Sequence, residues 1–265
     1  MEQGPASIEK FSLVRQHRRM LANMNCYLTR ESRILDFGCG AGNFVFQYRD
    51  AGFDAYGFDI RPAVIYRTPK DEKFFGFAMT GTPVNVPEYD VNRSSFRIPF
   101  EEGFFDFVFS TSILEHVQDH ELAFSEISRV LRPGGVAIHT FPSRYMLIEP
   151  HIHVPLGAAI QNYYWFLFWA LLGVRNEFQR HMDPVACAKI NVHYSRTGLK
   201  YLKIRALKGL ALKHFSQVEL IPHLWKLGDE VFATLWGSLL LMPCVHRFVR
   251  WLYNRCSTVV LFLKK

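Results

Sequence analysis

Short apolar runs alternate with longer mixed stretches along the first half of the chain. The apolar runs predict β-strands, and the mixed stretches between them have the spacing that is typical of helices. Ahead of the first run, residues 11–28 predict a helix that packs across the sheet. Because strands alternate with helices, we expect parallel strands joined by right-handed crossovers. The four clearest strands are expected at residues 33–37, 54–59, 105–110 and 136–140.

Three weaker runs complete the predicted sheet. Residues 74–91 are irregular and rich in Pro and Gly, and we expect one further strand within them. Residues 217–221 and 257–263 predict the sixth and seventh strands, and residues 195–213 predict a helix ahead of them. The pattern as a whole predicts an α/β fold with helices on both faces of the sheet.

Two long apolar segments, residues 154–174 and 231–245, interrupt the second half of the chain. The first contains no charged residue and is long enough to span a bilayer. A span there would leave the sixth strand across the membrane from the first five strands. We therefore expect both segments to cap the site or to lie in the membrane interface. Packing of the two segments on each other as ordinary core is the alternative.

The richest local signal follows the first strand, where a glycine-rich turn leads into a helix. Glycines 38 and 40 allow a tight turn whose backbone N–H groups come close to a nucleotide-like ligand. Asp59, about twenty residues further on, ends the second strand, where a carboxylate can accept hydrogen bonds from ribose hydroxyls. A dinucleotide site favours a third glycine where Asn43 stands, whereas Asp36 suits a cationic aminoacyl group. The pair therefore favours S-adenosylmethionine.

These residues resemble motif I of the class I methyltransferases, and four later blocks resemble those of the type 11 methyltransferases in the same order. The blocks are residues 98–100, 104–110, 114–117 and 129–135. The resemblance implies a Rossmann-like class I methyltransferase fold, with a mostly parallel seven-stranded sheet and hydrophobic helical insertions after strands five and six. It implies S-adenosyl-L-methionine as the cofactor and a set of cofactor-binding residues: Asp36, Phe37, Gly38, Gly40, Asp59, Ile60, Asn92 and Ser110.

Histidine and carboxylate residues after strands four and five are the candidates for the chemistry. His116 is the expected catalytic base, because methyl transfer to a hydroxyl benefits from a group that titrates near neutral pH. A structural role for His116, capping or orienting a loop, is the alternative. Glu149 and His151 are expected to bind the acceptor, and no metal site is predicted, since His151 and His153 lack a third ligand at a recognisable spacing.

The segment from Phe141 to His151 resembles one found in bacterial methyltransferases of polysaccharide and cell-surface glycan pathways. The resemblance implies O-methylation of a glycan or lipid-linked small-molecule acceptor near the membrane. A catalytically inactive adaptor of the same fold is the alternative function, and a nicotinamide-dependent oxidoreductase is a third. Intact Asp36, Gly38, Gly40 and Asp59 favour the enzyme over the adaptor.

Length, cysteine content and net charge limit the domain organisation, the compartment and the partners that we expect. The 265 residues predict a single domain, with an N-terminal helical region at 1–31, a cofactor-binding core at 32–142 and insertions at 143–194 and 222–256. Five cysteines without CxxC spacing indicate a reducing compartment, so we expect a cytoplasmic protein, peripheral on the inner face of the membrane. A net charge of +7 allows an acidic partner, but the chain carries no nucleic-acid-binding motif, and no nucleic acid is expected.

Overall fold

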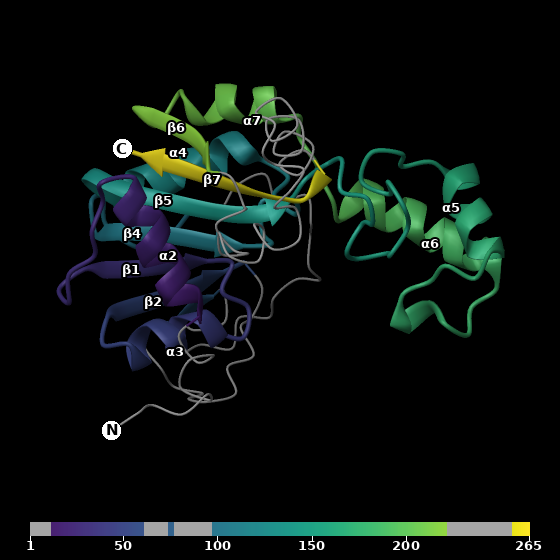
Figure 1. Cartoon of the computed structure of the whole chain (residues 1–265), viewed down its shortest axis with the longest axis horizontal. Coiled ribbons are helices and arrows are strands. Elements are labelled where there is room, and N and C mark those ends of the chain that lie inside the picture. The colour runs from purple at the N-terminus through teal and green to yellow at the C-terminus, as the bar shows by residue number, and fades with distance from the viewer. Residues whose placement is uncertain (1–11, 61–73, 77–96, 222–255) are drawn as a thin grey trace, which may run out of the picture.

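The computed structural model describes residues 12–60, 74–76, 97–221 and 256–265, and a seven-stranded sheet forms its centre (Figure 1). The strand order is β3-β2-β1-β4-β5-β7-β6, in which β7 is antiparallel to both of its neighbours and the other pairs are parallel. This confirms the predicted fold class. The strands are β1 (Arg33–Phe37), β2 (Asp54–Asp59), β3 (Phe74–Gly76), β4 (Phe105–Thr111), β5 (Leu131–Pro142), β6 (Gln217–Ile221) and β7 (Thr258–Lys264).

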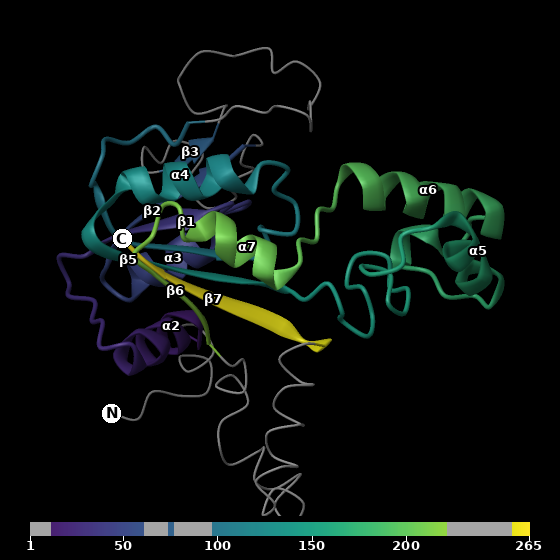
Figure 2. The ribbon, with the colours of Figure 1, turned by 90° about the horizontal axis from the view of Figure 1, so that it is seen from above.

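Helices cover both faces of the sheet (Figure 2). The helices α2 (Ser12–Asn23) and α3 (Asn43–Asp50) pack on one face, and α4 (His120–Val130) and α7 (Ile204–Ala211) pack on the other. The central strands are buried on both sides, which explains why β1 and β4 carry apolar side chains toward both faces of the sheet. The side chains of Ile34 and Phe107 face the α2–α3 side, and those of Leu35 and Val108 face the α4–α7 side.

After β5 the chain leaves the sheet and builds a separate lobe, defined here as residues 143–203 (Figures 1 and 2). The lobe contains α5 (Tyr163–Leu171), the 3-10 turn η1 (Glu177–Gln179) and α6 (Pro184–Thr197). The apolar segment 154–174 is therefore only partly helical. No helix within the described ranges combines the length and apolar character needed to cross a bilayer.

The predicted helix over residues 195–213 is wrong as a single element. The α6 helix ends at Thr197, and an extended link precedes α7 at Ile204. In that link the Lys200 N–H donates to the carbonyl of Glu115 at 2.7 Å, so the chain leaves the helix to reach the end of β4. The apolar segment 231–245, the insertion predicted after strand six and Asn92 lie outside the described residues.

Candidate active site

The glycine loop, residues 38–42, connects β1 to α3 at the carboxyl edge of the sheet. The N–H groups of Gly38 and Cys39 donate to the Phe58 carbonyl at 2.7 and 3.0 Å, and the Gly40 N–H donates to Asp59 Oδ2 at 2.9 Å. Gly38 and Gly40 have φ values of 82° and 49°, in the left-handed region that favours glycine. The predicted pairing of the glycine turn with Asp59 is therefore a direct contact.

A groove of about 520 Å³ opens beside this loop and is called the cofactor groove below. It is lined by Asp36, Gly38, Gly40 and Thr111, among others. Asp36 is 2% exposed, and within the described residues its Oδ2 atom has no hydrogen-bond partner. Burial, together with the charge of Asp59, raises the pKa of the Asp36 carboxyl well above its usual value. A cationic group in the groove would satisfy this oxygen, and an added Cβ at Gly40 would meet no protein atom. The groove thus fits the ligand that the sequence predicts.

The remaining predicted cofactor residues lie in different surroundings. Phe37 points into the core and stacks on Phe58, so only its backbone borders the loop. Ile60 follows Asp59 and is 44% exposed. Ser110 is fully buried, and its hydroxyl lies 2.8 Å from His139 Nδ1 on β5. Thr111, which the sequence reasoning did not single out, lines the groove in its place.

The segment after β4 runs from the groove to a second site. An added Cβ at Gly38 would clash with the Ile113 side chain, which shows how closely this segment crosses the glycine loop. Glu115 and His116 follow two and three residues later. The Nδ1 atom of His116 lies 2.8 Å from the Gly198 carbonyl, which can only accept, so Nδ1 carries the proton and Nε2 is left as the basic atom.

Glu115 is buried in an unusual state. Its side chain is 1% exposed, and neither carboxylate oxygen has a hydrogen-bond partner among the described residues. Burial raises the pKa of Glu115 to about 7. The carboxylate is therefore available to a ligand that supplies donors or positive charge.

Glu149, after β5, is by contrast fully satisfied. It is completely buried and accepts from the backbone N–H groups of His151 and Ile152, both at 2.8 Å, from His151 Nδ1 at 2.6 Å and from the Tyr201 hydroxyl at 2.8 Å. Burial raises the pKa of Glu149, but these hydrogen bonds outweigh it and hold the pKa below its usual value. Burial lowers the pKa of His151, and the bond to Glu149 reverses this, so that the net shift is upward.

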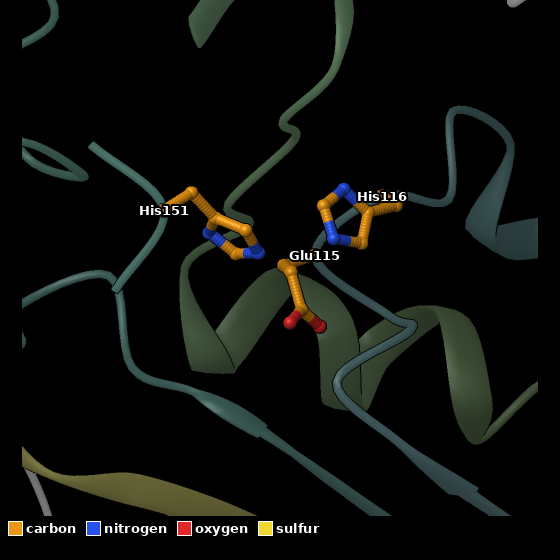
Figure 3. A group of neighbouring side chains, drawn as sticks. All are labelled: Glu115, His116 and His151. Atoms are coloured by element: carbon orange, nitrogen blue, oxygen red, sulfur yellow. The ribbon is translucent and has the colours of Figure 1, made fainter. Parts of the chain in front are cut away.

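The fold brings the two segments together into what we call the polar cluster: Glu115, His116, Glu149, His151 and Tyr201. The rings of His116 and His151 lie 4.8 Å apart, edge to face, and Glu115 lies between them (Figure 3). One ligand atom from each of Glu115, His116 and His151 lies within 4.8 Å of the others. His153 is exposed and outside this group. The sequence reasoning named His116, Glu149 and His151, but missed Tyr201, which lies 52 residues beyond Glu149 and has no motif around it.

Comparisons with known proteins agree with this geometry. Residues 35–139 match the family model described as a methyltransferase domain. The chain is 29% identical to an uncharacterized methyltransferase of Mycolicibacterium gilvum over 113 aligned residues. The aligned region is 43% of this chain and 40% of that protein. The chain is also 29% identical to the 2-methyl-6-phytyl-1,4-hydroquinone methyltransferase of Synechocystis over 106 aligned residues. That aligned region is 40% of this chain and 30% of the other protein. The chain thus spans less than half the length of these relatives.

The fold comparison extends over more of the chain. An S-adenosylmethionine-dependent methyltransferase from Mesorhizobium loti, solved by crystallography, matches 94% of this chain and 98% of its own, with 16% identity and a TM-score of 0.51. The fold is therefore that of the class I methyltransferases. The family match describes residues 35–139 as similar to a methyltransferase domain, and these residues include the glycine loop and Asp59.

Proposed function

We propose that the protein transfers the methyl group of S-adenosylmethionine to a hydroxyl of a glycan or lipid-linked acceptor at a membrane surface. The observation that carries the proposal is the position of the polar cluster. Ile113 lies against Gly38 of the glycine loop, and Glu115 and His116 follow it two and three residues later. An acceptor held by the cluster would therefore lie beside the groove that takes the cofactor.

In this proposal the residues of the groove hold the cofactor and the cluster holds the acceptor. Asp36 receives the aminoacyl group, Asp59 the ribose and Ile60 the adenine, with the backbone of Phe37, Gly38 and Gly40 lining the methionine part. Thr111 lines the groove near the methyl group, where the sequence suggested Ser110, which is buried against His139. Glu149 and His151 bind the acceptor. Most of the acceleration comes from near-attack geometry, with His116 Nε2 taking the hydroxyl proton as the O–C bond forms and the S–C bond breaks.

Titration calorimetry tests the cofactor part of the proposal. S-adenosylmethionine and S-adenosylhomocysteine are expected to bind with saturation and NAD not at all. Asp59→Asn keeps an oxygen for the Gly40 N–H and removes the charge, so it should weaken binding about tenfold or more. Asp54→Asn, at the opposite end of the same strand, is the matched control and should bind as the wild type does. Absence of adenosyl binding would favour the adaptor function.

The acceptor part needs a transfer assay. S-adenosylmethionine labelled in its methyl group, incubated with the protein and membrane lipid extract, should give labelled lipid-linked glycan. Methyl ethers survive alkali, whereas methyl esters do not, so label that alkali releases would contradict transfer to a hydroxyl. His116→Gln should lower the rate about 100-fold without changing cofactor affinity.

Membrane contact is proposed for the lobe, with an anionic lipid surface as the partner. Apolar side chains stand out from α5 and the turn after it: Tyr164, Phe168, Leu171, Leu172 and Phe178, of which Tyr164 and Phe178 are 80% and 84% exposed. Between residues 154 and 203, six Lys or Arg residues stand against two acidic ones. Aromatic and basic residues together suit the headgroup region of an anionic leaflet.

Sedimentation with vesicles of phosphatidylglycerol and phosphatidylcholine tests this contact. Trp165 and Trp169 of α5 are half-buried against the lobe core, and Trp165 Nε1 donates to the Pro155 carbonyl at 2.8 Å. Tyr164→Ser with Phe178→Ser is therefore the better variant, and Tyr27→Ser, a 73% exposed tyrosine between α2 and β1, is the control. Only the lobe variant should lose binding. No sedimentation of the wild type at low salt would overturn the proposal.

A further inference from the structure

The polar cluster contains one arrangement to which the proposed function gives no role: the imidazole rings of His116 and His151 on either side of the Glu115 carboxylate. The two imidazoles reach it from sequence positions 35 residues apart. Neither the glycine loop nor the methyl donor explains a buried carboxylate that has no hydrogen-bond partner among the described residues. Leaving both oxygens of a buried carboxylate unsatisfied is costly, so a ligand that supplies hydrogen-bond donors or positive charge would stabilise Glu115.

We propose that Glu115, His116 and His151 bind a divalent transition-metal ion, in a two-histidine, one-carboxylate site. Two nitrogens and one carboxylate oxygen are the ligand set of many catalytic zinc sites, which keep a further position open for water or substrate. Ligand atoms on one zinc ion stand about 3.4 Å apart in tetrahedral geometry, so the present separations of up to 4.8 Å need a small inward movement of the side chains.

The outer contacts of both histidines are those of metal ligands. A coordinating histidine almost always donates its other ring N–H to a carboxylate or a backbone carbonyl, which fixes the ring and raises its basicity. His151 Nδ1 donates to Glu149 Oε1 at 2.6 Å, and His116 Nδ1 donates to the Gly198 carbonyl at 2.8 Å. Both rings are therefore held with Nε2 directed toward the third ligand, as Figure 3 shows.

The outer carboxylate is itself held in place. Tyr201 and two backbone N–H groups fix Glu149, so the His151 ring cannot turn away without breaking a buried network. Glu149 and Tyr201 are thus positioning residues for the metal. This explains why the carboxylate of Glu149 accepts four hydrogen bonds, whereas that of Glu115 accepts none from the part of the chain that the structure describes.

A bound ion changes the role of His116, because one nitrogen lone pair cannot both coordinate a metal and take a proton. The base role belongs to the metal-free site. In the metal-bound site the ion's open position would receive the acceptor hydroxyl and make it more acidic, with its proton passing to solvent. That second part rests on the proposed function, whereas metal binding does not.

Metal binding is tested on the full chain without cofactor or acceptor. Zn²⁺ titration should show one tight site, and Co²⁺ should give the visible absorption of a four- or five-coordinate ion. Glu115→Gln keeps the shape of the side chain, and His151→Asn keeps a donor for Glu149 while deleting Nε2. Each should weaken Zn²⁺ at least tenfold and abolish the Co²⁺ spectrum, with the thermal transition retained as the check on folding.

His153→Asn is the matched control, because His153 lies two residues away, outside the cluster, with a φ of 60° that asparagine tolerates. It should bind both ions as the wild type does. Equal binding by the wild type, Glu115→Gln and His151→Asn would overturn the site, as would a lack of Zn²⁺ binding by the wild type. Because Asp59→Asn reports on S-adenosylmethionine and these variants report on the metal, the two proposals can fail independently.

Discussion

The cofactor groove and the polar cluster share one edge of the sheet but are assembled in opposite ways. The groove is lined mainly by one continuous stretch, the end of β1, the glycine loop and α3, with Thr111 added from the end of β4. Gly40 also joins this stretch to Asp59 at the end of β2 by a hydrogen bond. The cluster takes its side chains from the ends of two strands and from the link between α6 and α7. Local backbone geometry makes the first site, and tertiary contacts make the second. Substitutions in the groove and in the cluster should therefore differ in their effects on stability and on cofactor binding.

The largest effect is expected at Glu149. Glu149→Ala leaves the buried Tyr201 hydroxyl and two backbone N–H groups without their acceptor, and should lower the free energy of unfolding by about 3–5 kcal/mol. Tyr201→Phe removes one donor of four and should cost about 1 kcal/mol. Denaturant unfolding measures both. If Glu149→Ala costs no more than Tyr201→Phe, the cluster is not the tertiary network described here.

Two matched glycine substitutions separate the loop's own geometry from its contact with the cluster. Gly38→Ala forces a methyl group into the Ile113 side chain at a φ of 82°, and should cost about 3 kcal/mol of stability. Gly40→Ala meets no protein atom and should cost about 1 kcal/mol, while its methyl group enters the groove and weakens S-adenosylmethionine binding.

Unfolding and calorimetric titration of the two variants give both quantities. Adding Ile113→Ala to Gly38→Ala makes room for the new methyl group and should recover part of the lost stability, as a double-mutant cycle would show. A purely additive cycle would mean that the segment before Glu115 does not press on the glycine loop.

The pH dependence of stability provides a test of the shared sheet beneath both sites. His139 is fully buried beside Ser110, and burial lowers its pKa to about 3, from an ordinary value near 6.5. As the pH falls below 6.5, the unfolded chain takes up a proton that the folded chain does not. This group's contribution to stability is therefore intact above pH 6.5 and is lost progressively down to about pH 3.

Between pH 6.5 and 5 this proton uptake costs about 2 kcal/mol. Denaturant unfolding at the two pH values should show a flatter dependence in His139→Asn than in the wild type. His193→Asn removes an exposed histidine on α6 and should leave the dependence unchanged. Equal slopes in all three proteins would mean that the pKa of His139 is the same in the folded and the unfolded chain.

The groove could be predicted from the sequence better than the cluster, because the groove depends on local geometry and the cluster on tertiary contacts. Five strands, β1, β2, β4, β6 and β7, were predicted within one residue of their observed bounds, because each is a short, mainly apolar run. The strand β5 begins at Leu131, five residues before its predicted start, because residues 132–135 are Arg, Pro, Gly and Gly and show no apolar pattern. The pairing of the glycine turn with Asp59 was also predictable, since both features lie at strand ends. The contact between Glu115 and His151 could not be predicted, because no pattern in the sequence indicates which turn after β5 folds back toward the end of β4. The break between α6 and α7 was missed for a related reason: the link is extended to reach the Glu115 carbonyl, a contact that local propensity does not encode.

The smallest predicted effect compares two helix caps of similar strength. Asp119 caps α4 by accepting from the Leu122 N–H at 2.9 Å, and Asp183 caps α6 by accepting from the Val185 and Ala186 N–H groups at 2.9 and 3.1 Å. Replacing either with Ala should cost about 1 kcal/mol. Asp119 comes three residues after His116, whereas Asp183 lies in the lobe.

Loss of the Asp119 cap should therefore loosen the segment that carries Glu115 and His116 and slow methyl transfer severalfold, with cofactor affinity unchanged. Loss of the Asp183 cap should leave both quantities as they are, although the unfolding midpoint falls. Steady-state kinetics and calorimetry on the two variants make the comparison. If Asp119→Ala weakens cofactor binding as much as it slows transfer, the segment after β4 supports the groove and the cluster together. The two sites would then depend on the same tertiary contacts, and the contrast between a locally built groove and a tertiary cluster would be wrong.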